Sequence, residues 1–296
     1  MTRTSAMTRS LYFAAVFGQS VRTVAGKAEA AAIELHGVTK RFVSLTDVSF
    51  TALRDLDLTV APGEFVAVVG PTGCGKSTTL ALISGLEAPS AGTVKVFGEP
   101  VTSVGRSIGY VFQRDAVFPW KSVLDNVAMG PKFRGVASDQ ANTDALQWIA
   151  RVGLEGFEKY FPHQLSGGMR KRVALAQTLI NHPKILLMDE PFSALDVMTR
   201  ALMENELLEL WASTGSSVVF VTHDLEEAIG LADRVVVITA GPGTIKGTYK
   251  VDLPRPRNIA EIRFQPRFIE LYEEIWNDLR DEVLVSYERS KRKVAI

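Results

Sequence analysis

The stretch that decides the fold is "FVAVVGPTGCGKSTTLALISGL", residues 65–86. Its first five residues are all apolar, as in a strand that is covered on both faces. Its last eleven residues have helical spacing, and "GPTGCGKS" between the two matches the pattern G-x-x-x-x-G-K-[ST]. Such a loop gathers backbone N–H groups around phosphate oxygens at a helix N-terminus. The stretch therefore predicts a strand, a nucleotide-phosphate loop and a helix.

Within this loop, Lys76 would supply a point charge to the outer phosphates, and the Ser77 hydroxyl can ligate Mg²⁺. The residues expected to contact the nucleotide are Gly70, Pro71, Thr72, Gly73, Cys74, Gly75, Lys76, Ser77 and Thr78. Cys74 has two interpretations. It is either a small space-filling residue or a thiol acidified by the helix N-terminus and by Lys76.

Three more short runs are almost continuously apolar: "KILLMDE" (184–190), "SVVFVTH" (217–223) and "RVVVITA" (234–240). Segments with helical spacing follow the first two of these runs. Alternation of buried strands and helices predicts an α/β fold with a mostly parallel sheet. Residues 33–60 alternate between polar and apolar and predict an antiparallel β edge near the entry strand.

The same patterns divide the chain. From 114 to 180 the strand pattern disappears and helical spacing replaces it, so we expect a helical subdomain inserted into an α/β domain that spans 33–250. Residues 1–32 are predicted to be a poorly ordered extension. A secretory signal is the competing interpretation, because arginines precede a short apolar piece at 11–17.

Residues 251–296 are predicted to be a C-terminal extension that contains an amphipathic helix. Five apolar or aromatic side chains fall on one face of this helix and are expected to face the core. They are Phe268, Leu271, Tyr272, Ile275 and Leu279.

Composition narrows the function classes. The 33 Lys and Arg residues balance 33 Asp and Glu residues, so the chain has no overall basic field of the kind that favours nucleic acid. The single cysteine excludes an internal disulfide framework and fits a reducing compartment. No apolar run reaches the roughly 20 residues that span a bilayer, so the chain is expected to be soluble on its own.

Polar side chains end two of the predicted strands and the short run "YVFQ". Asp189 and Glu190 close "ILLMDE", His223 closes "SVVFVTH", and Gln113 closes "YVFQ" (110–113). Ligands bind at the carboxyl ends of strands in open α/β sheets. We expect Asp189 to hold Mg²⁺ and Glu190 to orient or deprotonate the attacking water. His223 is either catalytic or a packed or capping residue, and the Gln113 amide can reach the metal and the γ-phosphate.

A second glycine-rich turn, "LSGGMRKR" (165–172), opens a predicted helix far from the phosphate loop. Together with "GPTGCGKST", "YVFQ", "ILLMDEP", "SALD" (193–196) and "VTHD", in this order, it resembles the ATP-binding subunit of an ABC transporter. The resemblance covers about residues 33–250. It implies a P-loop NTPase (RecA-like) fold, an ATPase that uses ATP and Mg²⁺, and a position on the cytoplasmic face of the cell membrane.

The resemblance also implies that two copies pack head to tail. Ser166, Gly167 and Gly168 of one copy would close over the γ-phosphate that Lys76 of the other copy holds. Asp196 of "SALD" is also expected to contact the nucleotide. A Ser and two Gly at a helix start form an anion-binding terminus without a lysine of their own. The turn would then contact the partner's nucleotide.

Two positions differ from the commonest form of the family. Met169 stands where that form has Gln, and Phe42 in "TKRF" stands where an aromatic residue, usually Tyr, stacks on adenine. Phe still offers a π face, and Phe50 is the competing candidate for this contact.

"LSGGM" and "FPWKSVLDNV" (118–127) look most like the branch that serves nitrate, sulfonate and taurine importers. The implied partners are integral membrane permease subunits and, indirectly, a solute-binding protein. Phe118, Pro119 and Trp120 are either contacts for the permease or internal packing. The alternatives are a non-transport ABC ATPase that acts on nucleic acid or the ribosome, and a small-molecule P-loop kinase.

Overall fold

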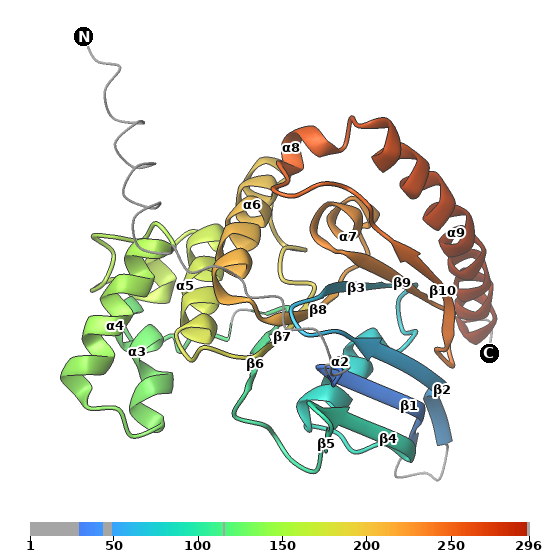
Figure 1. The fold of residues 1–296 in the computed structure, drawn as a ribbon, viewed down its shortest axis with the longest axis horizontal. Coiled ribbons are helices and arrows are strands. Elements are labelled where there is room, and N and C mark those ends of the chain that lie inside the picture. Colours follow the sequence, from blue (N-terminus) through green and yellow to red (C-terminus); the bar gives the residue numbers. More distant parts are fainter. Residues whose placement is uncertain (1–29, 44–48, 115, 295–296) are drawn as a thin grey trace, which may run out of the picture.

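A six-stranded sheet forms the centre of the protein (Figure 1). The computed structural model describes residues 30–43, 49–114 and 116–294. The strand order is β10-β9-β3-β8-β7-β6, and all neighbours are parallel except the edge strand β10. The strands are β3 (Phe65–Val69), β6 (Ile108–Val111), β7 (Ile185–Asp189), β8 (Ser217–Val221), β9 (Arg234–Ile238) and β10 (Ile245–Lys250). The carboxyl ends of β3, β6, β7 and β8 therefore lie at the same edge of the sheet.

The four apolar runs seen in the sequence form strands at the predicted positions. Every residue of β3 and β8 is buried, because the sheet carries an apolar core on each face. The helices that follow these strands are α2 (Lys76–Ser84), α6 (Val197–Thr214) and α7 (Leu225–Leu231). The α/β fold with a mostly parallel sheet is confirmed.

The antiparallel part differs in detail from the sequence prediction. The strands β1 (Ile33–Val43), β2 (Ser49–Val60), β4 (Ala91–Val96) and β5 (Glu99–Pro100) form a sheet of their own, in the order β2-β1-β4-β5. They cover α2 and one face of the parallel sheet through residues such as Leu35 and Leu58. The antiparallel edge of the main sheet is instead β10. Pairing between distant strands, which local alternation does not encode, decides both points.

A group of helices lies at one end of the molecule (Figure 1). It consists of α3 (Val123–Phe133), α4 (Ser138–Arg151), the 3₁₀ turn η1 (Pro162–Gln164) and α5 (Gly167–Leu179). The buried Asn126 side chain organises the entrance to this group, since it hydrogen-bonds both the N–H and the carbonyl of Phe118 and the carbonyls of Lys121 and Ser122.

The chain ends in the short helix α8 (Ile259–Ile262) and the long helix α9 (Pro266–Val294). Phe268, Leu271, Ile275 and Leu279 are at most 5% exposed, and Tyr272 packs against the same core at partial burial, so the predicted core-facing stripe is confirmed. No helix in the described ranges is both long and apolar enough to cross a bilayer. The extension predicted for residues 1–32 falls almost entirely outside the described residues.

Candidate functional site

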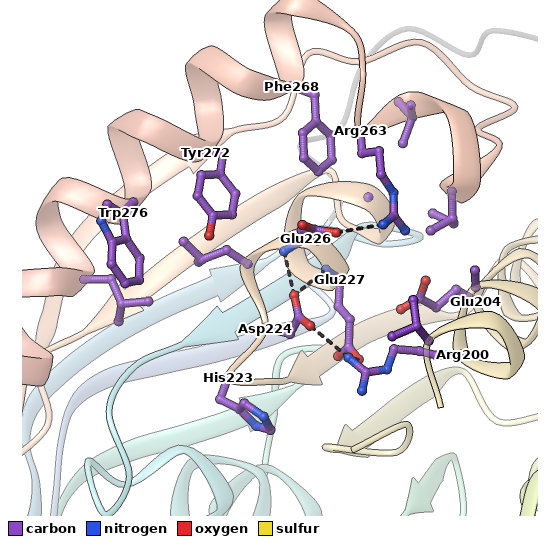
Figure 2. Close-up of a pocket in the computed structure, with 17 residues that line it drawn as sticks. Arg200, Glu204, His223, Asp224, Glu226, Glu227, Arg263, Phe268, Tyr272 and Trp276 are labelled. Carbon is purple, nitrogen blue, oxygen red and sulfur yellow. Dashed lines mark hydrogen bonds and ion pairs between the residues drawn. The ribbon is translucent and has the colours of Figure 1, made fainter. Parts of the chain in front are cut away.

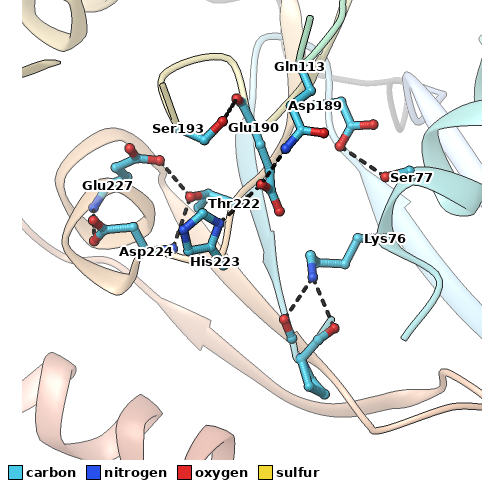
Figure 3. Close-up of polar contacts among 12 residues, drawn as sticks. Lys76, Ser77, Gln113, Asp189, Glu190, Ser193, Thr222, His223, Asp224 and Glu227 are labelled. Atoms are coloured by element: carbon cyan, nitrogen blue, oxygen red, sulfur yellow. Dashed lines mark hydrogen bonds and ion pairs between the residues drawn. The ribbon is translucent and has the colours of Figure 1, made fainter. Parts of the chain in front are cut away.

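The site is built around the loop between β3 and α2 (Figure 3). Gly75 has a φ of 101°, and a Cβ at this position would lie 2.6 Å from Leu53 Cδ2, so only glycine fits here. Lys76 is 7% exposed, and its ammonium donates to the carbonyls of Gly70 (2.8 Å) and Pro71 (3.1 Å). The loop thus curls around a lysine that its own carbonyls hold in place.

A carboxylate faces this loop from the end of β7. Ser77 Oγ donates to Asp189 Oδ1 at 3.1 Å. Burial raises the pKa of Asp189, and the neighbouring charge of Glu190 adds to the effect, although hydrogen bonds from Ser77 and Tyr110 and the charge of Lys76 oppose it. Burial and the Asp189 charge in turn raise the pKa of Tyr110. A half-buried carboxylate whose pKa is raised by desolvation is stabilised by a nearby cation, so Asp189 is suited to receive one.

Glu190 brings three predicted residues together. Its Oε2 accepts a hydrogen bond from Gln113 Nε2 at 3.1 Å and lies 3.1 Å from His223 Nδ1. Its backbone adopts φ = 42°, and its N–H donates to the carbonyl of Val221 at 2.9 Å. This left-handed conformation turns the side chain away from the direction that a continued strand would give it, so both acids reach the same rim.

A second layer of polar contacts lies behind His223 and was not predicted from the sequence. Thr222 Oγ1 donates to Glu227 Oε2 at 2.6 Å and accepts from the N–H of Asp224 at 3.0 Å. Arg200 reaches across from α6, with Nη1 2.9 Å from Asp224 Oδ2 and 3.5 Å from Glu227 Oε1. No local pattern signals this link, because Arg200 looks like an ordinary helical arginine. Arg200 ties the start of α6, which the Asp196 side chain caps, to the rim that carries His223.

Comparison with known proteins agrees with this geometry. The sequence profile described as ABC transporter matches residues 53–193. An uncharacterised ABC transporter ATP-binding protein of Methanocaldococcus jannaschii is 48% identical over 235 residues, which cover 79% of this chain and 86% of that protein.

The chain belongs to the ATP-binding proteins of ABC transporters. A nitrate import ATP-binding protein of Synechocystis is 42% identical, covering 78% of this chain and 89% of that protein. A taurine import ATP-binding protein of Yersinia pestis is 45% identical, covering 66% and 76%. A dimeric ATP-binding cassette solved in a post-hydrolysis state with ADP and Pi has 31% identity and a TM-score of 0.67, and the match covers 75% of this chain and all of that one. The chain is therefore an ATP-binding cassette with ATPase chemistry.

The cassette's second glycine turn starts α5. Ser166 is the N-cap, and its Oγ accepts a hydrogen bond from the N–H of Met169 at 3.2 Å. Figure 1 shows α5 among the helices at one end of the molecule, whereas α2 lies against the antiparallel sheet. The two glycine turns are therefore separate in one chain. A link from α5 does reach the rim that carries Glu190, because Lys171 Nζ donates to the Gln113 carbonyl at 2.7 Å.

Two further predictions concern single side chains. Phe42 is 38% exposed, with the Lys40 ammonium 4.8 Å from its ring centroid, and it pairs directly with Phe50 across β1 and β2. Phe50, together with Thr72 and Gly73, lines a small pocket at the phosphate loop, so both aromatics remain candidates for the adenine contact. The acidified-thiol hypothesis for Cys74 is wrong: the side chain is fully buried, and burial raises its pKa more than the Lys76 charge lowers it. Cys74 fills space.

Proposed function

We propose that this cassette is the ATP-hydrolysing subunit of an importer for a small anionic solute of the nitrate, sulfonate or taurine kind. It would work as a homodimer on the cytoplasmic face of the membrane, with separate permease subunits fed by a solute-binding protein. The importer names of the nitrate and taurine relatives support this assignment over an ATPase that acts on nucleic acid or the ribosome.

The observation that carries the proposal is the open helix start at Gly167 and Gly168. Neither residue has a positive φ, and a Cβ on Gly167 would meet no atom closer than 3.9 Å. The chain's own packing therefore does not require glycine at 167. What glycine leaves free is the approach to the N–H groups of the first turn of α5, where a phosphate binds well. A second copy, whose Lys76 holds ATP, would supply that phosphate.

The proposed reaction follows from the residues around Glu190. ATP would bind with its outer phosphates at Lys76, and Ser77, Asp189 and Gln113 fit a Mg²⁺ ion, which prefers a few oxygen ligands beside substrate phosphate and water. Magnesium would neutralise charge on the β- and γ-phosphates. The water oxygen attacks the γ-phosphorus, the bond to the β–γ bridging oxygen breaks, and Glu190 takes the water proton. His223 and Gln113 keep the Glu190 carboxylate in position through their 3.1 Å contacts.

Docking to the permease would use the groove between β6, α3 and α5. This groove has a volume of about 340 Å³ and is lined by Tyr110, Phe112, Phe118 and Phe133, among others. Phe133 is 83% exposed, and Trp120 beside the groove is 70% exposed.

For Phe118, Pro119 and Trp120, the sequence left permease contact and internal packing open. Phe118 packs edge-on against Trp120, whereas Pro119 and Trp120 lie open to a partner. Lys171 would carry movement of this region to Gln113.

A mixing experiment tests the composite site. Lys76→Ala disables the phosphate loop, and Ser166→Arg blocks the start of α5, so each variant alone should form dimers without a working site. An equimolar mixture contains heterodimers in which one of the two sites is intact, and we expect ATPase activity to return. The control is a mixture of Lys76→Ala with Lys76→Ala/Ser166→Arg, which has no intact site. If the first mixture stays inactive although heterodimers form, the composite site is refuted.

The importer assignment has its own test. In proteoliposomes with the permease, a binding protein loaded with taurine or nitrate should stimulate ATP hydrolysis. Stimulation only by a solute outside this class, such as a sugar, would refute the proposed solute class but would not contradict the assignment of the chain as an ATPase.

A further inference from the structure

A cavity of about 500 Å³ lies between α6, α7 and the C-terminal helices α8 and α9 (Figure 2). Its volume falls in the range of small-molecule sites. The neighbouring His223 and Asp224 form part of its rim, so the cavity lies directly behind the catalytic edge of the sheet. The ATPase mechanism uses none of its deeper side chains.

The two walls of the cavity differ in chemistry. One wall is aromatic: Phe268, Tyr272 and Trp276 point inward from successive turns of α9 (Figure 2). The opposite wall carries the carboxylates of Glu204, Asp224, Glu226 and Glu227 and the guanidinium groups of Arg200 and Arg263. Carboxylates therefore outnumber guanidinium groups by two.

Glu204 is the carboxylate that lacks a partner. It is 3% exposed, and among the described residues it forms no hydrogen bond and no ion pair. Its neighbours are satisfied: Glu226 pairs with Arg263 at 3.2 Å, and Glu227 accepts from Thr222. Burial, followed by the charges of Glu227 and Asp224, raises the pKa of Glu204 to about 8. With this pKa, Glu204 is mostly neutral at pH 7 and becomes an unpaired buried charge as the pH rises past about 8, where an opposite charge in the cavity would stabilise it.

The arginines favour a cation over an anion as the occupant. The Nη1 atom of Arg200 is already paired with Asp224 and Glu227, and that of Arg263 is paired with Glu226. Each retains a buried Nε without a partner, so an anion is the competing occupant. A cation, however, would satisfy Glu204 and at the same time find aromatic faces on the other wall.

We propose that this cavity binds a small organic cation, with Glu204 as its charge partner and the aromatic side chains of α9 against its apolar body. The site is separate from the nucleotide site, and its occupancy does not depend on the importer assignment. It shares Arg200 and Asp224 with the contacts behind His223, so an occupant would touch the network that supports the catalytic rim.

Three probes of nearly equal shape test the charge preference: 2-phenylethylammonium, 2-phenylethanol and phenylacetate. Binding to the full chain without nucleotide is measured by calorimetry and by intrinsic tryptophan fluorescence, to which Trp276 on the cavity wall contributes. We expect the cation to bind at least about tenfold more tightly than the alcohol, and phenylacetate to bind most weakly. Equal affinities for cation and alcohol, tighter binding of phenylacetate, or no binding of the cation at millimolar concentration would each overturn the proposal.

Variants assign the charge partner. Glu204→Gln should weaken 2-phenylethylammonium binding by about tenfold or more, whereas Glu209→Gln, an exposed residue of the same helix outside the cavity lining, should leave it unchanged. If Glu204→Gln does not fold, Tyr272→Leu on the opposite wall should weaken the cation several-fold more than the alcohol. Unchanged cation affinity in whichever variant folds would refute the assignment.

The pH dependence gives a second readout. Glu204 must be ionised to pair with the cation, so affinity should rise about tenfold between pH 7 and pH 8.5. The charged groups that face Glu204 are Arg200 on α6, Asp224 and Glu227 at α7, and Arg263 after α8. This rise in affinity should be absent in Glu204→Gln. An equal rise in that variant would mean that another group titrates.

Discussion

Gly243 belongs to none of the sequence motifs, yet in the structure it packs against the phosphate loop. We therefore predict that a larger residue at 243 disturbs this loop. Gly243 occupies the turn between β9 and β10, where its N–H donates to the Ala52 carbonyl (2.8 Å) and its carbonyl accepts from the N–H of Arg54 (2.9 Å). A Cβ at this position would lie 2.1 Å from the carbonyl oxygen of Cys74, inside the loop that holds Lys76. Gly243→Ala therefore drives a methyl group into the nucleotide site from behind.

The geometry sets the magnitude. The Cβ starts 2.1 Å from the Cys74 oxygen and ordinary van der Waals contact begins at 3.4 Å, so the two atoms must separate by 1.3 Å or more. Overpacking of this kind costs about 1–3 kcal/mol. Hydrogen bonds to Ala52 and Arg54 hold Gly243 on both sides, so the phosphate loop is the part that moves. Because a displacement of about 1 Å at a reacting site can cost as much as 10²-fold, we expect ATP affinity to fall by about tenfold or more.

The assay is titration with a fluorescent ATP analogue beside a thermal unfolding scan. Gly105→Ala is the matched control, since its Cβ would meet no atom closer than 3.5 Å and its φ is not positive. Unchanged ATP affinity in folded Gly243→Ala would refute the reasoning. A lower unfolding temperature with unchanged affinity would mean that the β9–β10 turn yields instead of the loop.

Three more predictions follow from individual contacts. Lys76→Ala removes the ammonium that the Gly70 and Pro71 carbonyls hold, and it should abolish ATP binding while the circular dichroism spectrum is retained; normal affinity would remove Lys76 from the site. His223→Ala should lower kcat by about 10²–10³-fold with ATP affinity nearly unchanged, because the contact to Glu190 acts on the attacking water, and a loss in affinity instead would assign His223 to binding. For Glu204, whose folded pKa of about 8 lies above its unfolded value, the folded state binds the extra proton, so stability contributed by this group is lost as pH rises from about 4.5 to 8. Glu204→Gln should therefore gain thermal stability over the wild type at pH 8.5 but not at pH 5, and an equal difference at both pH values would contradict the raised pKa.

Local sequence patterns were sufficient for much of the fold. Uninterrupted apolar runs predicted β3, β7, β8 and β9, because a strand covered on both faces needs apolar side chains at every position. The polar residues that end two of these runs predicted the rim at which Asp189, Glu190 and His223 lie, since parallel strands end at one edge of a sheet. Gln113 lies at the same rim, just after the short strand β6, which is not one of these runs.

Other features could not be predicted because they arise from contacts between distant segments. Cys74 looked like a thiol at a helix N-terminus, but the packing of the antiparallel sheet and β9 around it buries the sulfur and raises its pKa. The separate sheet of β1, β2, β4 and β5 follows from strand pairing, which alternation along one strand leaves open.

By itself the sequence determined the chemistry of this protein: a phosphate loop, two acids, a histidine and a second glycine turn, each written in a short local pattern. Only the tertiary structure decided which distant groups meet, as in the contact of Arg200 with Asp224, the close approach of Gly243 to Cys74, and the burial of Glu204 opposite the aromatic face of α9. The physical reason is that backbone propensity and burial pattern act over a few residues. The desolvation, charge and steric contacts that define these sites act between elements that meet only when the apolar cores on the two faces of the sheet have formed.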